Sequence, residues 1–199
     1  MREIATPHGP ARVRLQTVDG ARAALVLGHG AGGGVGAPDL VAARDTALEL
    51  GVSVALIEQP YRVAGRRSPA RAAQLDASWL AVLAYLRQRV FDGLSLVCGG
   101  RSSGARVACR TAAEGGAAAV LCLAFPLHPP GRGDDPSKSR LPELAAVELP
   151  VLVIQGERDP FGRPPAGRGR KLVLVPGDHS LRNKTAVASA VRDWLPGVV

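Results

Sequence analysis

Along the chain, short apolar runs alternate with stretches in which apolar residues recur at a helical spacing. Six apolar runs, rich in Val, Leu and Ala, are each bounded by polar or turn residues. Runs this short and this continuous are typical of strands covered on both faces, as in a parallel sheet. The predicted strands lie at residues 21–28, 52–58, 94–99, 117–125, 149–156 and 170–177.

Between these runs, the spacing of apolar residues predicts amphipathic helices. Apolar residues recur at three- and four-residue steps from Leu75 to Val90 and again from Val187 to Leu195. Pro38 and Gly51 bracket a third helix, because proline suits a first helical turn and glycine a helix end. Strands alternating with helices predict an α/β fold, with a mainly parallel sheet and helices on both faces. We find no repeat or linker, so residues 1–199 are expected to form one domain.

Two segments interrupt this alternation. Residues 126–147 are rich in proline, glycine and charge, and they are too long for a tight connection, which favours a functional excursion. Residues 160–169 lie where another crossover helix is due, but they contain three prolines and three glycines. Because both residue types disfavour a helix interior, this crossover is predicted to be a loop or a helical stub.

The charge balance raises the question of a nucleic-acid partner. The net charge is +8, but the arginines are scattered from Arg2 to Arg192. The densest basic group, residues 162–171, has no interleaved aromatic platform for bases, so we expect no nucleic-acid partner. No apolar run is long enough to span a bilayer, and the N-terminal residues lack the apolar segment of a signal peptide. We therefore expect a cytoplasmic protein with no membrane partner.

The three cysteines show no C-x-x-C spacing, and their number is odd. This pattern favours reduced, buried thiols over a disulfide framework or a metal site. Two cysteines lie in strand-like runs and one in a helix-like stretch: Cys98, Cys122 and Cys109.

The segment CGGRSSGARVA, residues 98–108, places two serines between glycines after a predicted strand. Gly100, Ser102 and Gly104 fit the pattern G-x-S-x-G, which is typical of a sharp turn that exposes a nucleophilic serine. The glycines would allow the strand and the following helix to pack closely. Ser103 is out of phase with them, so Ser102 is the candidate nucleophile. The alternative is an ordinary turn rich in glycine and serine.

The loop after the first predicted strand reads GHGAGGG, residues 28–34. Its amides could face an anion, but the lysine and Ser/Thr of a P-loop are missing. The loop also fits the weak pattern G-x-G-x-x-G, and Glu58 follows at a distance compatible with a dinucleotide site. From this loop alone, a dinucleotide site and an oxyanion-binding loop both remain open.

Two further polar residues follow predicted strands at the same edge of the sheet. Asp159 comes after the fifth run and His179 after the sixth, which gives the order Ser, Asp, His found in α/β-hydrolases. Glu157 is a reserve acid, and Asp178 is a poorer partner because adjacent side chains diverge. A dinucleotide site would leave Ser102, Asp159 and His179 unexplained, so we favour a hydrolase. The N–H groups near Ala31 and at Ser103 would then form the oxyanion hole.

Together with FPLHPPG, these motifs resemble the α/β-hydrolase superfamily, and more narrowly its bacterial dienelactone-hydrolase-like group. That group is related to testis-expressed protein 30 and to subunit 3 of the NSL histone acetyltransferase complex. The resemblance implies an α/β-hydrolase fold with a reduced cap. The expected reaction of a serine, a histidine and an aspartate needs no metal or organic cofactor. The resemblance also implies that Ser102 is the nucleophile, Asp159 the acid and His179 the base.

His128, in FPLHPPG, follows the fourth predicted strand and is a candidate substrate contact. A loop histidine held between prolines is the alternative.

The expected activity is hydrolysis of a small ester, or a related acyl compound, through an acyl-enzyme. The alternative is a non-catalytic binding or scaffold protein, because the eukaryotic relatives are known as subunits of complexes. The oligomeric state stays open.

Overall fold

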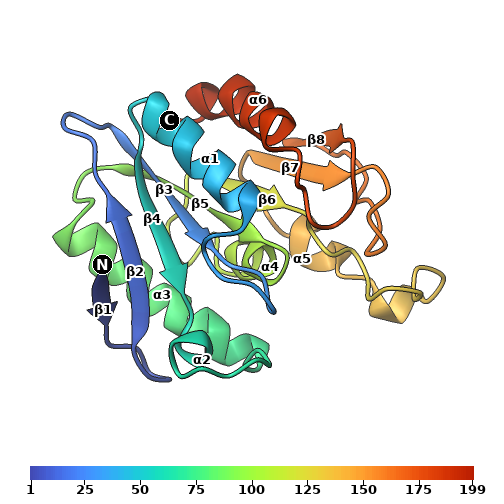
Figure 1. Ribbon diagram of the computed structural model, residues 1–199, viewed down its shortest axis with the longest axis horizontal. Coiled ribbons are helices and arrows are strands. Elements are labelled where there is room, and N and C mark those ends of the chain that lie inside the picture. Colours follow the sequence, from blue (N-terminus) through green and yellow to red (C-terminus); the bar gives the residue numbers. More distant parts are fainter.

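The computed structural model of the protein describes residues 1–199 and contains one eight-stranded sheet (Figure 1). The strand order is β1-β2-β4-β3-β5-β6-β7-β8. The first two strands are antiparallel to their neighbours, and the other six run parallel to one another. The strands are β1 (Arg2–Ile4), β2 (Ala11–Gln16), β3 (Ala23–Gly28), β4 (Ser53–Glu58), β5 (Ser95–Arg101), β6 (Ala119–Leu123), β7 (Val151–Gly156) and β8 (Arg170–Val175).

Each of the six predicted apolar runs forms one of the parallel strands. Every residue of β3, β6 and β7 is buried, because helices cover both faces of the sheet there. The predicted α/β architecture with a mainly parallel sheet is therefore confirmed. Because β3 to β8 run parallel, the carboxyl ends of β3, β5, β7 and β8 lie at one edge of the sheet.

The two antiparallel strands at the N-terminus were not predicted. β2 alternates between buried apolar and outward polar positions: Ala11 and Val13 are buried, while Arg14 is exposed. This two-residue period is typical of a strand with one covered face, and it is the signal that would have identified β2. Val13 lies opposite Ile57 of β4, so β2 extends the sheet beyond the parallel strands.

The predicted helices form, and they divide between the two faces of the sheet (Figure 1). α1 (Pro38–Glu49) and α6 (Lys184–Trp194) cover one face, and α3 (Ala72–Arg89) and α4 (Ser103–Arg110) cover the other. Each pair seals a separate cluster of buried apolar side chains. A short helix after β4, α2 (Pro60–Val63), was not predicted.

The two interruptions are irregular in the structure, as expected. The segment between β6 and β7 holds only a 3-10 turn (Pro136–Lys138) and α5 (Leu141–Ala145), so the cap is reduced. Glu143 ties α5 to α4 by accepting hydrogen bonds from Arg106 at 2.8 Å and from Arg110 at 3.3 Å. No helix forms between β7 and β8, which confirms the predicted loop.

All three cysteines are buried and free, as predicted. Burial raises the pKa of the Cys98 thiol to about 12, so this thiol stays protonated at neutral pH. The Sγ atoms of Cys109 and Cys122 lie 3.5 Å apart without a disulfide. None of the helices combines the length and the hydropathy that crossing a membrane requires.

Candidate active site

Ser102 lies on a strained turn between β5 and α4. Its backbone has a φ of 53° and a ψ of −108°, a left-handed conformation that costs a residue other than glycine about 1–3 kcal/mol. The flanking glycines make the turn possible. A Cβ on Gly100 would lie 2.5 Å from the carbonyl oxygen of Gly28, and one on Gly104 would lie 2.6 Å from the carbonyl carbon of that residue. The turn therefore packs directly on β3 and exposes the serine hydroxyl.

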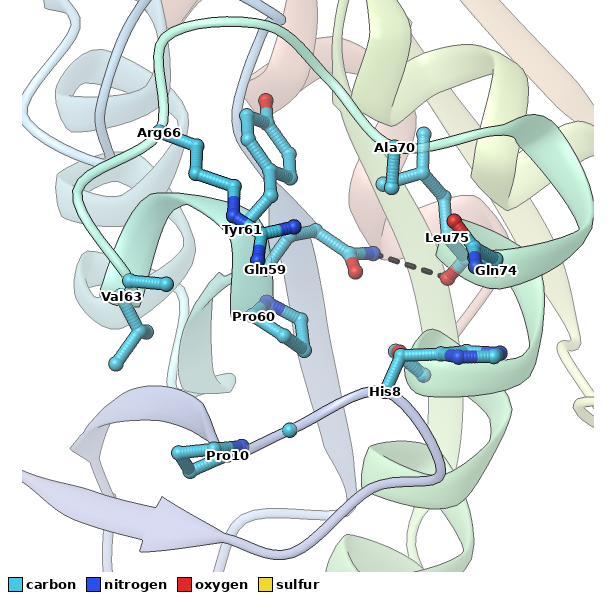
Figure 2. Close-up of a pocket in the computed structure, with 13 residues that line it drawn as sticks. His8, Pro10, Gln59, Pro60, Tyr61, Val63, Arg66, Ala70, Gln74 and Leu75 are labelled. Atoms are coloured by element: carbon cyan, nitrogen blue, oxygen red, sulfur yellow. Dashed lines mark hydrogen bonds between the residues drawn. The ribbon is translucent and has the colours of Figure 1, made fainter.

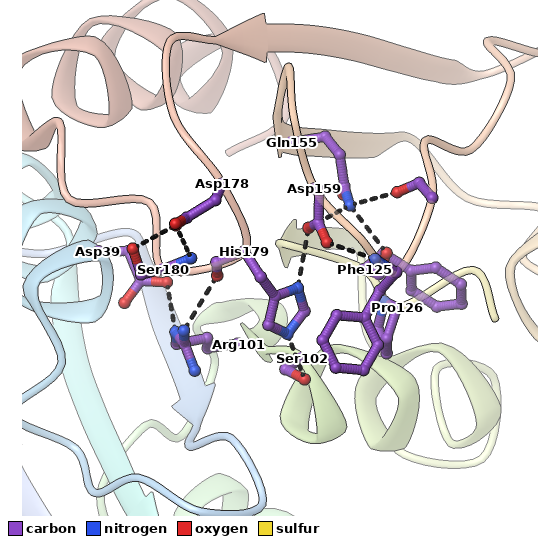
Figure 3. A network of polar contacts seen from close by, with 12 residues as sticks. Asp39, Arg101, Ser102, Phe125, Pro126, Gln155, Asp159, Asp178, His179 and Ser180 are labelled. Carbon is purple, nitrogen blue, oxygen red and sulfur yellow. Dashed lines mark hydrogen bonds and ion pairs between the residues drawn. The ribbon is translucent and has the colours of Figure 1, made fainter. Parts of the chain in front are cut away.

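The side chains of Ser102, His179 and Asp159 form a continuous chain of hydrogen bonds (Figure 3). His179 Nε2 lies 3.0 Å from Ser102 Oγ, and His179 Nδ1 lies 2.8 Å from Asp159 Oδ2. The carboxylate can only accept, so Nδ1 carries the hydrogen and Nε2 accepts from the serine hydroxyl. The structure thus brings together the three residues that the sequence singled out.

Neither of the two alternative acids forms a hydrogen bond with the imidazole. Glu157 is exposed and its side chain forms no hydrogen bond within the chain. Asp178 turns toward Ser180, whose N–H donates to Asp178 Oδ1 at 2.9 Å. Hydrogen bonds from Ser180 lower the pKa of the Asp178 carboxyl. Asp178 therefore shapes the turn that carries His179 and does not pair with its ring.

Asp159 is held by residues of its own strand and turn. Its side chain is fully buried, Phe161 N donates to Oδ1 at 2.8 Å and Gln155 Nε2 donates to Oδ2 at 2.8 Å. The Phe161 ring packs on the His179 ring, with 4.1 Å between ring centroids. Gln155 and Phe161 were missed at the sequence level. The available signal was Gln155, a polar residue at the end of an otherwise apolar strand.

The loop after β3 is fixed by the buried His29. Its Nδ1 donates to the carbonyl oxygen of Gly30 at 2.8 Å, and its Nε2 accepts from the N–H of Gln59 at 3.0 Å. Burial lowers the pKa of His29, which keeps the ring neutral and suits an acceptor at Nε2. Tyr61 also holds this loop in place, because its hydroxyl donates to the carbonyl oxygen of Ala31 at 2.9 Å.

The two predicted oxyanion donors keep their N–H groups available. Neither Ala31 N nor Ser103 N donates to another group of the chain. Ser103 is the first residue of α4, where unpaired amides and the helix dipole favour negative charge. Both amides flank the turn of Ser102, since Ser103 follows it directly and a Cβ on Gly30 would lie 3.6 Å from Ser102 Cβ.

The sequence profile of the family described as "Alpha/beta hydrolase domain" matches residues 21–193 of this chain. The chain belongs to this family. No curated protein sequence matches the chain.

Solved structures with the same fold include several α/β hydrolases of low sequence identity. A dienelactone hydrolase from Anabaena variabilis is 19% identical, with a TM-score of 0.77, and the match covers 100% of this chain and 96% of that one. An α/β serine hydrolase without a lid from Xanthomonas campestris is 22% identical, with a TM-score of 0.73 over 98% and 94% of the two chains. Est1E from Butyrivibrio proteoclasticus, in its ferulic acid complex, is 17% identical, with a TM-score of 0.74 over 100% and 99%.

Within this α/β-hydrolase fold, His128 lies beside the turn that carries Asp159 and Phe161. Its ring Nδ1 contacts the carbonyl oxygen of Pro129 at 2.8 Å, and its backbone N–H donates to the carbonyl oxygen of Phe161 at 3.0 Å. A Cβ on Gly162 would lie 2.5 Å from His128 Nε2. These contacts join the excursion after β6 to the turn after β7. The substrate contact expected for His128 stays a prediction.

A cavity of about 460 Å³ lies at the carboxyl end of β4 in this hydrolase fold (Figure 2). Tyr61 and Leu75 line it, and they also border a much smaller void beneath Ser103. Gln59 closes its floor by donating from Nε2 to the carbonyl oxygen of Leu75 at 3.1 Å. Gln59, Tyr61 and Leu75 therefore border both the cavity and the smaller void beside Ser103.

Proposed function

We propose that the protein is a serine hydrolase that cleaves a small ester, or a related acyl compound, through an acyl-enzyme. The observation that carries this proposal is the unbroken chain of hydrogen bonds from Ser102 Oγ through His179 to the buried Asp159. A serine whose hydroxyl donates to an oriented imidazole is an activated nucleophile. The family membership supports the same reaction class.

In the proposed first step, Ser102 Oγ attacks the substrate carbonyl carbon while His179 Nε2 takes the hydroxyl proton. The new C–O bond converts the carbonyl into a tetrahedral oxyanion. His179 then returns the proton to the leaving alcohol oxygen as its bond to carbon breaks. In the second half, water attacks the acyl-enzyme with the same proton transfers and releases the acid.

Asp159 and the two backbone amides have separate roles in this mechanism. Asp159 keeps the hydrogen on Nδ1 and stabilises the imidazolium, while Phe161 N and Gln155 hold the carboxylate in place. The N–H groups of Ala31 and Ser103 would donate to the oxyanion, and losing one such donor typically costs about 3 kcal/mol.

The surroundings of the site favour small substrates. The excursion after β6 holds only one 3-10 turn and the five-residue α5, and most of its residues are polar or proline. It offers no long apolar wall for an acyl chain. The fold likeness to a serine hydrolase without a lid is consistent with an open site.

Several finer points belong to the same proposal. The reduced, buried cysteines support a cytoplasmic location. One sheet with one apolar cluster on each face supports a single domain over residues 1–199. The dispersed arginines support a protein without a nucleic-acid partner. The resemblance to the group of testis-expressed protein 30 keeps a non-catalytic binding protein as the alternative.

Covalent labelling with a fluorophosphonate tests the proposal directly. The wild-type protein should be labelled and should hydrolyse p-nitrophenyl acetate, and Ser102→Ala should lose both while staying folded. Ser103→Ala is the matched control and should still be labelled, because its hydroxyl has no imidazole partner. A folded wild-type protein that neither labels nor turns over would favour the binding-protein alternative.

A further inference from the structure

Arg101 is the last residue of β5 and directly precedes Ser102. Its side chain is only 18% exposed and contacts two distant segments (Figure 3). Nε lies 3.0 Å from Oδ2 of Asp39, and Nη2 donates to the backbone carbonyl oxygen of His179 at 3.0 Å. One guanidinium therefore joins the strand before the serine, the start of α1 and the loop that carries the imidazole.

We propose that Arg101 is a positioning residue, which holds the main chain of His179 so that the imidazole stays aligned with Ser102. Asp39 orients the guanidinium for this task. The inference rests on the proposed hydrolase function, because alignment matters only if His179 transfers the serine proton. Arg101 itself touches no reacting atom.

The Asp39 carboxylate is itself rigidly placed. Its side chain is fully buried in the first turn of α1, and Oδ1 accepts from the N–H of Leu40 at 2.9 Å. Burial raises the pKa of Asp39, and the charge of Arg101 opposes that rise. The amino end of α1 adds a favourable dipole for the charged form. This fixed carboxylate forms an ion pair with Nε, while Nη2 of the same guanidinium donates to the carbonyl oxygen of His179.

The same guanidinium packs against the loop that carries Ala31. A Cβ on Gly30 would lie 2.9 Å from Arg101 Nη1, so a side chain there would displace the arginine. Arg101 thus contacts the serine turn, the imidazole loop and the oxyanion loop together. A displacement of about 1 Å among reacting groups can lower a rate by about 10²-fold.

Lysine is the informative substitution at this position. Arg101→Lys keeps a positive charge beside the buried Asp39, so the fold should survive. A single ammonium cannot reproduce the planar fork that reaches both the carboxylate and the carbonyl. Arg101→Met is less informative, because it would leave a fully buried carboxylate without its partner.

Arg110→Lys provides a matched control. Arg110 is also 18% exposed and also forms an ion pair, with Nε donating to Asp76 Oδ2 at 2.8 Å, but it lies further along α4 from Ser102. The experiment measures kcat and KM for p-nitrophenyl acetate in both variants. It also measures amide hydrogen exchange of residues 176–183, which contain His179. We expect Arg101→Lys to lower kcat at least about tenfold with KM nearly unchanged, and to speed exchange in that segment. Arg110→Lys should do neither.

Each result decides the question. An Arg101→Lys variant with wild-type kcat and wild-type exchange would overturn the positioning role. Equal losses of kcat in Arg110→Lys would overturn it as well, because they would show a general loosening of the fold. If wild-type protein shows no labelling and no turnover, the proposed function fails, and the exchange comparison still tests whether Arg101 holds the loop of His179.

Discussion

Replacing Gly104 with alanine would place a methyl group against the backbone of β3. The added Cβ would lie 2.6 Å from the carbonyl carbon of Gly28 and 2.9 Å from the carbonyl oxygen of His29. Both neighbours are main-chain atoms in or next to a fully buried strand, so neither can rotate away. The helix α4 would have to move instead, and Ser102 and Ser103 would move with it.

The size of that movement follows from the contact distances. Ordinary van der Waals contact begins at 3.4 Å, against the 2.6 Å available, so α4 must retreat by about 0.8 Å. Overpacking of this kind costs about 1–3 kcal/mol of stability. A shift approaching 1 Å between Ser102, His179 and the oxyanion loop should also lower kcat by about 10²-fold.

Gly36→Ala is the matched control, because a Cβ there would meet nothing within 4 Å. Urea denaturation gives the stability of both variants, and p-nitrophenyl acetate gives their kcat. The reasoning would be refuted by a Gly104→Ala variant that stays within about 0.5 kcal/mol of wild type and keeps its kcat within about twofold.

Three further predictions concern the acid, the substrate and the pH dependence of stability. Asp159→Asn should keep the fold but lower kcat by about 10⁴-fold. Because Glu157 is exposed, Glu157→Gln should leave kcat nearly unchanged. Equal losses of kcat in the two variants would overturn the assignment of Asp159. Across p-nitrophenyl esters from acetate to palmitate, kcat/KM should favour short chains, and a continued rise beyond octanoate would contradict the open, polar site. Burial alone would raise the pKa of Glu143, but Arg106 and Arg110 lower it below the ordinary value. Glu143→Gln should therefore be less stable than wild type by about 0.5–1 kcal/mol at pH 7. This gap should close in urea titrations as the pH falls from about 4.3 through the lowered pKa, because the carboxylate is then lost from both folded and unfolded chains.

The sequence predicted the parallel core because the strands of that core are buried on both faces. Such strands are continuous apolar runs in the sequence. It also indicated which side chains would meet, since Ser102, Asp159 and His179 each follow a different strand and the carboxyl ends of parallel strands share one edge. Their catalytic roles stay predictions until the variants are measured.

The parts that were missed depend on contacts between distant segments. In the sequence, Arg101 is an ordinary polar residue after the predicted strand at 94–99. Only the fold places Asp39 and the carbonyl oxygen of His179 around it. His29 likewise looks like part of a glycine-rich loop, although it bonds the end of β4 through Gln59 N. Hydrophobic periodicity carries no information about such pairings, because they depend on side-chain direction across separate loops.

The anchors of Asp159, namely Gln155 and Phe161, both lie within residues 155–162. Residues 165–168, further along the helix-free connection to β8, are exposed. Lengthening a loop of this kind costs about 0.6 kcal/mol for each doubling. This connection is therefore a site where the chain can accept a peptide tag or an inserted domain, or be reopened as new termini in a circular permutant, while Asp159 keeps its position.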